Sequence, residues 1–449
     1  MRQEQIKSTL SRLTDARRKQ SLVCLLTVVS LYFRWLPVHS GILLALTLLY
    51  AVAVSRSHPT INNVTKPLLL LTPAFLVHLV CITRDSLKYG FQPIFILDLL
   101  NIATIALFAL FIRTVNLDYF VPRLRQYQIF AGAALSLIPS ALIVVGFASY
   151  ILEEQSTELT ITMTEFVNSN IDYNIMAFLL LISLNSLVFT RRIKFPFYVF
   201  STIISIGILF SSSRRAFLLL LFLLPLTILL RPSIKLPNLR KVSYGIGFAF
   251  AISAATLVLA HIKPFKNHII SKAIVAPLIR PLSLAMTPLE FNKLHYDLVH
   301  NIQDHLKVST EYKTFADSIG ELALQPRSNR LKSAFSLIEK FTPLQHVFGN
   351  SFYLKELGRM NNFPSDYPHN FLVTSYISTG TIGLILISSC ILIALLGLYL
   401  HKSEWAHEIL IGLFISISFS LTSGFSYWSF LPISLYTTIG IFLLFRDKS

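Results

Sequence analysis

The chain has 449 residues, of which 53% are hydrophobic and 14% are charged. Soluble domains carry about 25% charged residues, so the composition excludes a soluble enzyme, a disordered chain and a secreted disulfide scaffold. The net charge is +17, which in a soluble protein would suggest nucleic acid. Here the basic residues lie mostly in short segments between apolar runs, and no nucleic-acid-binding motif occurs. We therefore expect a lipid bilayer, and no nucleic acid, among the partners.

The hydrophobic residues are gathered in runs of roughly 17–25, the length with which a helix crosses a bilayer. Strands of a β-barrel would alternate in shorter segments. The sequence therefore predicts an all-α polytopic membrane protein with about twelve transmembrane helices. We expect the tenth, a long one, to tilt or kink. The expected ranges are 21–38, 40–55, 67–82, 92–112, 128–150, 173–189, 196–211, 215–230, 243–261, 371–400, 409–422 and 428–445.

The distribution of Lys and Arg predicts the orientation of these helices. Inside-facing loops of membrane proteins are enriched in both residues. Here the basic tail, the C-terminal end and alternate segments such as 113–127 and 401–408 together hold 21 Lys and Arg, whereas the short outside loops hold four. This bias predicts that both termini are cytoplasmic. The basic tail lacks a small-residue cleavage site after it, so we expect a retained first helix. The expected divisions are the tail 1–20, helices one to nine in 21–261, a periplasmic loop 262–370, helices ten to twelve in 371–445 and the cytoplasmic end 446–449.

The segment 262–370 is polar and far longer than the other loops. Its sequence from Thr287 to Glu290 resembles a capping box with Pro at the first helical position. Apolar residues then recur at helical spacing, and a second apolar stripe is formed by Leu331, Phe335, Ile338 and Phe341. We therefore expect one large, partly helical periplasmic loop that lies over the membrane.

Two adjacent arginines, Arg214 and Arg215, follow three serines between two apolar runs. Charges at such depth in a membrane protein are costly and usually functional. Guanidinium groups suit phosphate because they hold it with two hydrogen bonds. A tight polar turn, with both arginines reaching the lipid headgroups, would explain the same residues. The residues themselves leave both interpretations open.

A second candidate is His369, which lies with Asn370 directly before an apolar helix that contains Gly380 and Gly383. A neutral imidazole at the membrane surface is a suitable general base near neutral pH. Asp366, three residues earlier, could orient the imidazole. The alternative without a catalytic role is a histidine that faces water at a helix start, with glycines that ease helix packing. No cysteine or histidine cluster has the spacing of metal ligands, so we expect neither a metal site nor a cofactor.

The spacing H-N-x9-G-x-x-G, from His369 to Gly383, resembles the motif of the O-antigen ligase family, which related O-antigen polymerases share. The segment Ser213-Arg214-Arg215-Ala216 resembles the Ser-Arg-Gly-type motif of that family. Arg330, followed by Phe348-Gly349-Asn350, resembles its loop segment, although Arg327 is a rival for the position. The expected topology is similar as well.

The resemblance implies a bacterial inner-membrane glycosyltransferase with a periplasmic active site. Its donor would be a glycan on undecaprenyl diphosphate, and its acceptor lipid A–core. His369 would be the catalytic base, while Arg214, Arg215 and Arg330 would bind the donor diphosphate in place of a metal ion. Asn370, Asp366, Gly380 and Gly383 would support the site. The reaction would invert the anomeric carbon.

Other functions remain open on the sequence. An O-antigen polymerase would use the same donor with a lipid-linked repeat as acceptor, and a single dominant outside loop favours the ligase. A protein oligosaccharyltransferase belongs to the same class. A transporter predicts inverted repeats and matching broken helices, neither of which the sequence contains, and it would leave His369 without a role.

Overall fold

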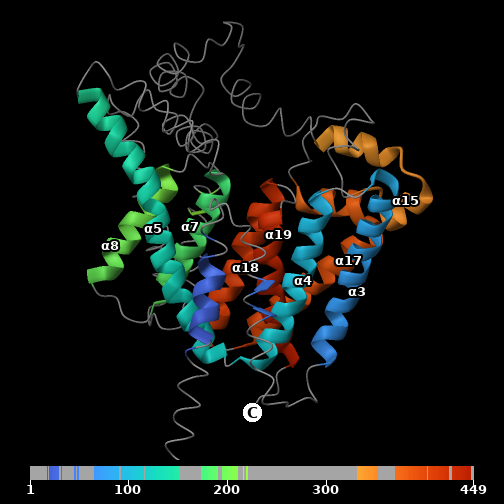
Figure 1. Cartoon of the computed structure of the whole chain (residues 1–449), viewed down its shortest axis with the longest axis horizontal. Coiled ribbons are helices and arrows are strands. Elements are labelled where there is room, and N and C mark those ends of the chain that lie inside the picture. Colours follow the sequence, from blue (N-terminus) through green and yellow to red (C-terminus); the bar gives the residue numbers. More distant parts are fainter. Residues whose placement is uncertain are drawn as a thin grey trace, which may run out of the picture. The chain divides into compact units, whose positions relative to one another are not determined.

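The computed structural model describes a set of helices and the segments that join some of them (Figure 1). Every regular element among the described residues is a helix. The chain divides into two compact units, Met1–Ala131 with Ser336–Ser449, and Gly132–Phe335. The described residues are 18, 20–29, 32, 45–46, 48–49, 65–90, 93–115, 117–151, 173–190, 195–210, 216, 219–220, 331–351, 370–401, 403–423 and 427–445.

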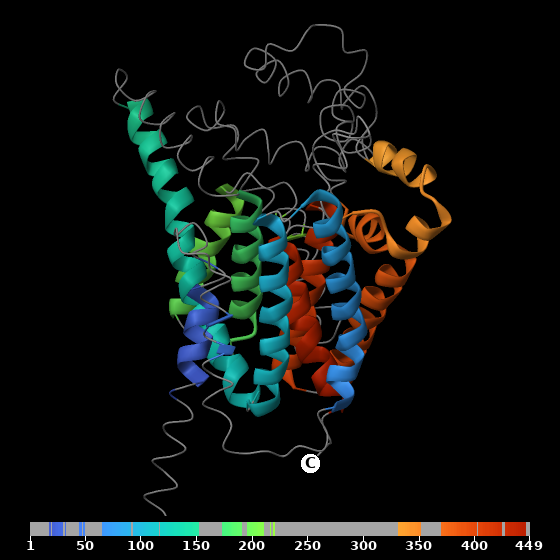
Figure 2. The same ribbon diagram turned by 45° about the vertical axis from the view of Figure 1, so that its right-hand side comes forward.

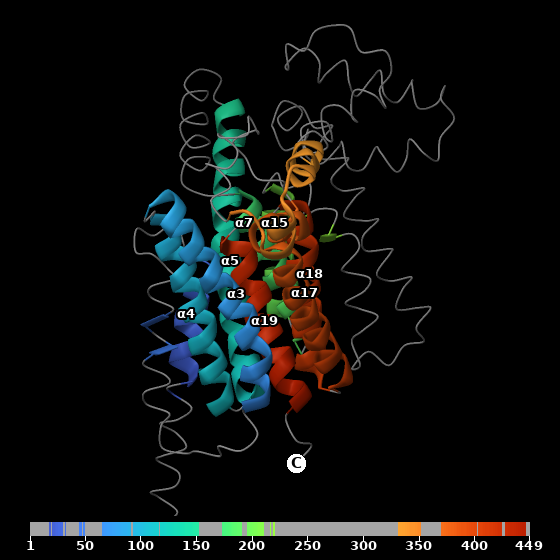
Figure 3. The ribbon, with the colours of Figure 1, turned by 90° about the vertical axis from the view of Figure 1, so that its right-hand side faces the viewer.

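The first unit is a bundle around the two helices α17 and α19. α17 packs against α3, α18 and α19, while α19 also packs against α4. The four helices α3, α4, α17 and α19 lie along one another (Figure 2). A short helix, α15, packs on α17 near the end at which α17 begins (Figure 3). The bounds in this unit are α3 Thr65–Tyr89, α4 Pro93–Thr114, α15 Pro343–Phe348, α17 Phe371–Leu400, α18 Glu404–Ser423 and α19 Tyr427–Phe445.

Small residues let α17 and α19 approach each other closely. A Cβ atom added at Gly397 of α17 would overlap the backbone carbonyl of Gly440 on α19. One added at Gly440 would overlap Ala394 in the same way. Such small-residue contacts are the usual means by which membrane helices pack, because apolar side chains gain little from leaving lipid. The α17–α19 pair is therefore the closely packed centre of the first unit.

The second unit contains the later part of α5 (Leu117–Ile151), α7 (Tyr173–Val188) and α8 (Phe195–Phe210). Glycine faces serine at its helix contacts. A Cβ atom at Gly132 would overlap the Ser183 side chain, and one at Gly207 would overlap Ser136. Both serines donate to a carbonyl one turn earlier in their own helices. Their hydroxyls are thereby satisfied inside an apolar contact.

Three helices among the described residues are long and apolar enough to cross a membrane: Leu70–Tyr89, Phe371–Leu400 and Glu404–Leu421. The range predicted for the tenth helix, 371–400, agrees with α17. The kink expected there is confirmed, since the helix is broken at Gly380. Of the expected helix 21–38, residues 21–29 and 32 are described and are helical. Few residues of 40–55 and 215–230 are described, and 243–261 lies outside the described residues.

The loop predicted over 113–127 is wrong over most of its length, because α5 already begins at Leu117. Leu117, Phe120 and Leu124 recur at helical spacing and are buried, so this stretch has an apolar face. Arg125, whose charge favoured a loop, is buried and paired with Glu408 of α18. That pair lies within the first unit. α18 begins at Glu404, inside the loop expected over 401–408.

The helix expected around the second apolar stripe of the large loop is present over residues 331–339. Its buried positions are Ala334 and Leu337, with Phe341 just beyond its end. Phe335, which we expected on the apolar stripe, is 53% exposed. The prediction of a helix is therefore confirmed over these residues. The stripe expected after Thr287 lies outside the described residues.

Candidate functional site

Asn370 begins α17 as its N-cap residue. Its backbone is extended, with φ −142° and ψ 118°, and its side-chain oxygen accepts hydrogen bonds from the backbone N–H groups of Leu372 (3.0 Å) and Val373 (3.1 Å). Asparagine is among the best N-caps because its short side chain reaches these otherwise unpaired donors. Asn370, which we expected to support the site, thus fixes the first turn of α17. The neighbouring His369 and Asp366 lie outside the described residues.

The two glycines of the G-x-x-G motif are required by a break in α17. Gly380 has φ 66° and ψ −164°, a conformation that glycine adopts readily and other residues avoid. A Cβ atom at Gly380 would also overlap the backbone carbonyl of Val347 in α15. One at Gly383 would overlap the side chain of Thr379, just before the break. The motif therefore encodes a kink against which another segment packs.

The segment that packs into this kink is α15 with the turn that follows it. Thr342 caps α15 by a capping box with Gln345, and Pro343 occupies the first turn. Gly349, at φ 76°, then ends the helix, and a Cβ atom there would overlap the backbone of Ser378. The chain leaves no room for a side chain at this position. The Phe348-Gly349-Asn350 segment and the G-x-x-G motif are thus in direct contact.

Hydrogen bonds join the two segments on both sides of the kink. The backbone N–H of Asn350 donates to the Ile377 carbonyl at 2.7 Å. The Thr381 hydroxyl donates to the His346 carbonyl at 2.9 Å. A break in a helix leaves backbone groups without their usual partners, and these groups must be satisfied from elsewhere. α15 and the following turn supply some of those partners.

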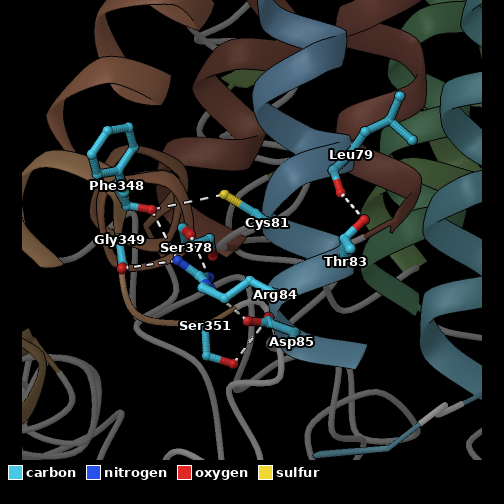
Figure 4. Close-up of polar contacts among 9 residues, drawn as sticks. All are labelled: Leu79, Cys81, Thr83, Arg84, Asp85, Phe348, Gly349, Ser351 and Ser378. Carbon is cyan, nitrogen blue, oxygen red and sulfur yellow. Dashed lines mark hydrogen bonds and ion pairs between the residues drawn. The ribbon is translucent and has the colours of Figure 1, made fainter. Parts of the chain in front are cut away.

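Arg84, near the end of α3, supplies a further partner (Figure 4). Its Nη1 donates to the carbonyls of Phe348 (3.0 Å) and Gly349 (2.9 Å), and its Nη2 donates to the Ser378 carbonyl at 3.2 Å. The first two carbonyls lie at the C-terminal end of α15, and the third lies directly before the break in α17. A cation is favourable at a helix C-terminus, where carbonyl oxygens point outward. One guanidinium group therefore donates to carbonyls at two helix ends, the end of α15 and the end of the first segment of α17.

Asp85 orients that guanidinium from the next position of α3. Its Oδ1 accepts from Arg84 Nε at 2.9 Å, and its Oδ2 accepts from the Ser351 hydroxyl at 3.1 Å. Asp85 and Ser351 are fully buried, while the Arg84 side chain is 30% exposed. A buried carboxylate requires a paired charge and hydrogen bonds, and it has both here. We call Arg84, Asp85, Phe348, Gly349, Ser351 and Ser378 the Arg84 junction.

An aromatic group borders this junction on α15 and α17. His346 Nδ1 lies 2.6 Å from the Tyr376 hydroxyl. Phe341 stacks on the Tyr376 ring, with 6.5 Å between centroids and 9° between planes, and its edge contacts His346. Aromatic rings with polar tips are suited to contact sugar and lipid headgroups at a membrane surface. They also hold Tyr376, six residues after Asn370, in one orientation.

The structure thus brings together Asn370, Gly380 and Gly383 with the Phe348-Gly349-Asn350 segment. His369, Asp366, Arg214, Arg215 and Arg330 lie outside the described residues, as does Arg327.

Sequence reasoning missed the site roles of Arg84, Asp85, His346 and Tyr376. The adjacent charges of Arg84 and Asp85 at the end of an apolar run were an available signal, since charged residues in such runs are often functional. The carbonyl partners of Arg84 lie more than 260 residues away in the chain, and no local pattern indicates them.

The described part of the chain contains no group of three or more His, Cys, Asp or Glu residues that could hold a metal ion. Among the comparisons with known proteins, no protein-family model matches the chain. No curated protein matches it either.

Proposed function

We propose that the chain is a membrane glycosyltransferase of the O-antigen ligase type, which transfers a glycan from undecaprenyl diphosphate to lipid A–core. One observation carries this proposal: the two segments whose sequences resemble that family, around Gly349 and from Asn370 to Gly383, pack against each other with glycine-specific fit. A shared site would need this proximity. The N-cap role of Asn370 adds a fixed helix start beside His369.

The proposed arrangement of the helices in the membrane suits this activity. About twelve spans, two cytoplasmic ends and one large periplasmic loop would place the beginning of α17 at the outer surface of the inner membrane. Three helices of suitable length and composition support the membrane location. The donor would remain anchored by its lipid while its diphosphate and glycan lie at the surface. The loop would exclude water and so limit hydrolysis of the donor.

The proposed reaction is a metal-independent displacement at the anomeric carbon. His369 accepts the proton of an acceptor hydroxyl, and the resulting oxygen nucleophile forms the new glycosidic bond. The bond between the anomeric carbon and the diphosphate breaks, and undecaprenyl diphosphate leaves with the electron pair. Arg214, Arg215 and Arg330 offset the negative charge of the donor and leaving group. Attack opposite the leaving group inverts the anomeric configuration.

A lipopolysaccharide gel tests the proposed function in the host bacterium. The strain that lacks the gene is complemented with wild type or with His369→Ala, and expression is matched by blotting. The proposal expects lipid A–core without any O-unit in the deletion and His369→Ala strains, with long glycan accumulating on undecaprenyl diphosphate. General base catalysis contributes about 100-fold or more, so the loss should be visible on a gel.

Other outcomes of the same gel would contradict the proposal. Core capped with a single repeat would mean an O-antigen polymerase, whose sequence motif and donor are the same but whose acceptor is a second lipid-linked repeat. A full ladder in the deletion strain would contradict a role in lipopolysaccharide. A full ladder with His369→Ala would contradict the assignment of His369 as the base.

A further inference from the structure

We infer that Arg84 is a positioning residue for the transfer reaction: it locks the loop segment around Gly349 onto α17 and thereby fixes the helical turn that begins beside His369. This inference rests on the proposed function for the reaction, and on the Arg84 junction for the geometry. Arg84 does so through four hydrogen bonds, three to backbone carbonyls and one to Asp85.

The backbone partners make Arg84 specific for this junction. The carbonyls of Phe348 and Gly349 lie at the end of α15, and that of Ser378 lies directly before the break in α17. A planar fork with several donors in fixed positions can reach three such oxygens at once. A lysine is a single point charge on a flexible stem, so it would keep the charge but lose the geometry.

The charge of Arg84 is already neutralised by Asp85, which Ser351 holds from the loop side. An arginine with these partners is poorly suited to receive a phosphate group as well. This separates Arg84 from the arginines proposed to bind the donor diphosphate. Its removal should therefore lower the rate of transfer without changing the KM for the donor.

Residues 371–379 lie between the N-cap of α17 and the break at Gly380. They rise about 13 Å, so Arg84 lies one short helical segment away from Asn370. The segment is held at its first end by the N-cap and at its second end by the Arg84 junction. Release of the second end would let the segment tilt, and misplacement of a catalytic group by about 1 Å can lower a rate about 100-fold.

Cys81 reports on the junction without any activity assay. It lies one turn before Arg84 on α3, is 3% exposed, and its Sγ lies 3.7 Å from the Phe348 carbonyl. If Arg84 holds the loop segment down, Arg84→Ala should uncover this thiol. The other two cysteines, Cys24 and Cys390, are buried elsewhere in the chain. They are internal controls for the integrity of the fold.

The experiment combines thiol labelling with kinetics on the full-length protein. Wild type, Arg84→Ala, Arg84→Lys and Lys88→Ala are purified in lipid nanodiscs and treated with a small maleimide, and labelled peptides are quantified by mass spectrometry. Lys88 is the matched control, because it is an exposed cation on the same helix, 4.9 Å from the Tyr89 ring centroid. Initial rates of glycan transfer are then measured at varied donor concentration.

We expect Arg84→Ala to raise Cys81 labelling at least ~10-fold, since hydrogen bonds to a charged group are lost. Labelling of Cys24 and Cys390 should not change. We further expect kcat to fall about 100-fold at an unchanged donor KM, with no rescue by Arg84→Lys and no effect of Lys88→Ala. If Arg84→Ala does not purify as a folded protein, Ser351→Ala replaces it. That variant removes one hydroxyl and should raise Cys81 labelling and lower kcat to a smaller extent.

Two results would overturn the inference. Cys81 that stays protected in folded Arg84→Ala, or in Ser351→Ala when that variant is used, would show that Arg84 does not close the junction. A wild-type kcat in Arg84→Ala would show that the junction does not position the reaction. If wild type transfers no glycan although Arg84→Ala exposes Cys81, the proposed function fails and the positioning role falls with it, while closure of the junction by Arg84 stands.

Discussion

Two arginines of the first unit, Arg84 and Arg125, hold different kinds of partner near opposite ends of α17. Arg84 donates to backbone carbonyls of a loop segment and of α17 before its break. Arg125 donates to the carboxylate of Glu408, at 2.8 Å from its Nε, and joins α5 to α18 just beyond the other end of α17. A second side-chain bond, from Trp405 to Asp118 at 2.8 Å, joins the same two helices.

The two arginines distinguish polar contacts that hold the fold from polar contacts that shape the site. The Arg125–Glu408 pair links two helices, and both of its side chains are at most 10% exposed. The Arg84 junction links a helix to the segments that carry the family resemblance, and its guanidinium is more exposed. We therefore expect changes at Arg125 to act on stability and changes near Arg84 to act on transfer.

Arg125→Ala should give the largest loss of stability. It leaves the carboxylate of Glu408, which is 5% exposed, buried without its charge partner. Loss of one member of a buried pair costs about 3–5 kcal/mol. Chemical denaturation in detergent micelles measures this value. Arg123→Ala is the matched control, because Arg123 is exposed on the same helix and its removal should have little effect.

A paired substitution sharpens this prediction. Arg125→Met with Glu408→Met removes both charges and keeps apolar volume, so it should recover most of the lost stability. Transfer activity of this double variant should be close to that of wild type. A loss in Arg125→Ala no larger than in Arg123→Ala would contradict the structural role of the pair.

Gly380→Ala should affect both stability and transfer. The positive φ and the overlap with the Val347 carbonyl together should cost about 2–4 kcal/mol, and α15 should be displaced from α17. Gly90→Ala is the control, because Gly90 also has positive φ (74°) but nothing lies within 4 Å of an added Cβ. It should cost about 1 kcal/mol and leave transfer unchanged. Equal transfer rates in both variants would contradict the role of the kink.

Asn370→Ala should lower stability by about 1 kcal/mol, because two N–H groups of α17 lose their acceptor. We expect a larger relative effect on transfer, since the first turn beside His369 would fray. Asn370→Asp keeps a capping oxygen and is the control for stability. Thermal unfolding and transfer rates, measured on the same samples, test this. An equal loss of transfer rate in Asn370→Ala and Asn370→Asp would not depend on the capping oxygen. It would indicate direct contact of the amide with substrate.

Thr381→Val should give the smallest effect, about 1 kcal/mol or less, because one hydroxyl bond to the His346 carbonyl is lost. Thr83→Val is the control, since the Thr83 hydroxyl bonds within its own helix to Leu79. Cys81 labelling should rise slightly in Thr381→Val and not in Thr83→Val. Identical labelling would mean that this bond does not help to hold α15 on α17.

Many of the helix ranges can be predicted from the sequence, because apolar runs end where polar residues begin. The range expected for α17 agrees with the structure, and those for α7, α8 and α19 agree within about two residues. The predicted range 128–150 begins eleven residues after the start of α5, because the charges of Arg123 and Arg125 lower the local hydropathy. The carboxylate that allows Arg125 to be buried lies on another helix, and such a pairing has no local signature.

Part of the candidate site could also be predicted from the sequence. Glycines at Gly380 and Gly383 and the polar Asn370 are features of one continuous motif, and the structure gives each a backbone role. The contact between Gly349 and Ser378 arises from tertiary packing. The hydrogen bonds that the Arg84 guanidinium makes across this contact also arise from tertiary packing. A charged pair at the end of an apolar run marks Arg84 and Asp85 as unusual, but it does not name their partners.

The most direct test of the central claim is glycan transfer by the purified protein. Wild type, His369→Ala and Lys88→Ala are placed in lipid nanodiscs with a glycan on undecaprenyl diphosphate and lipid A–core, and product is followed by mass spectrometry. We predict a ligated glycan and released undecaprenyl diphosphate with wild type and Lys88→Ala, and a rate at least ~100-fold lower with His369→Ala. Absence of product with wild type, or an equal rate with His369→Ala, would contradict the account.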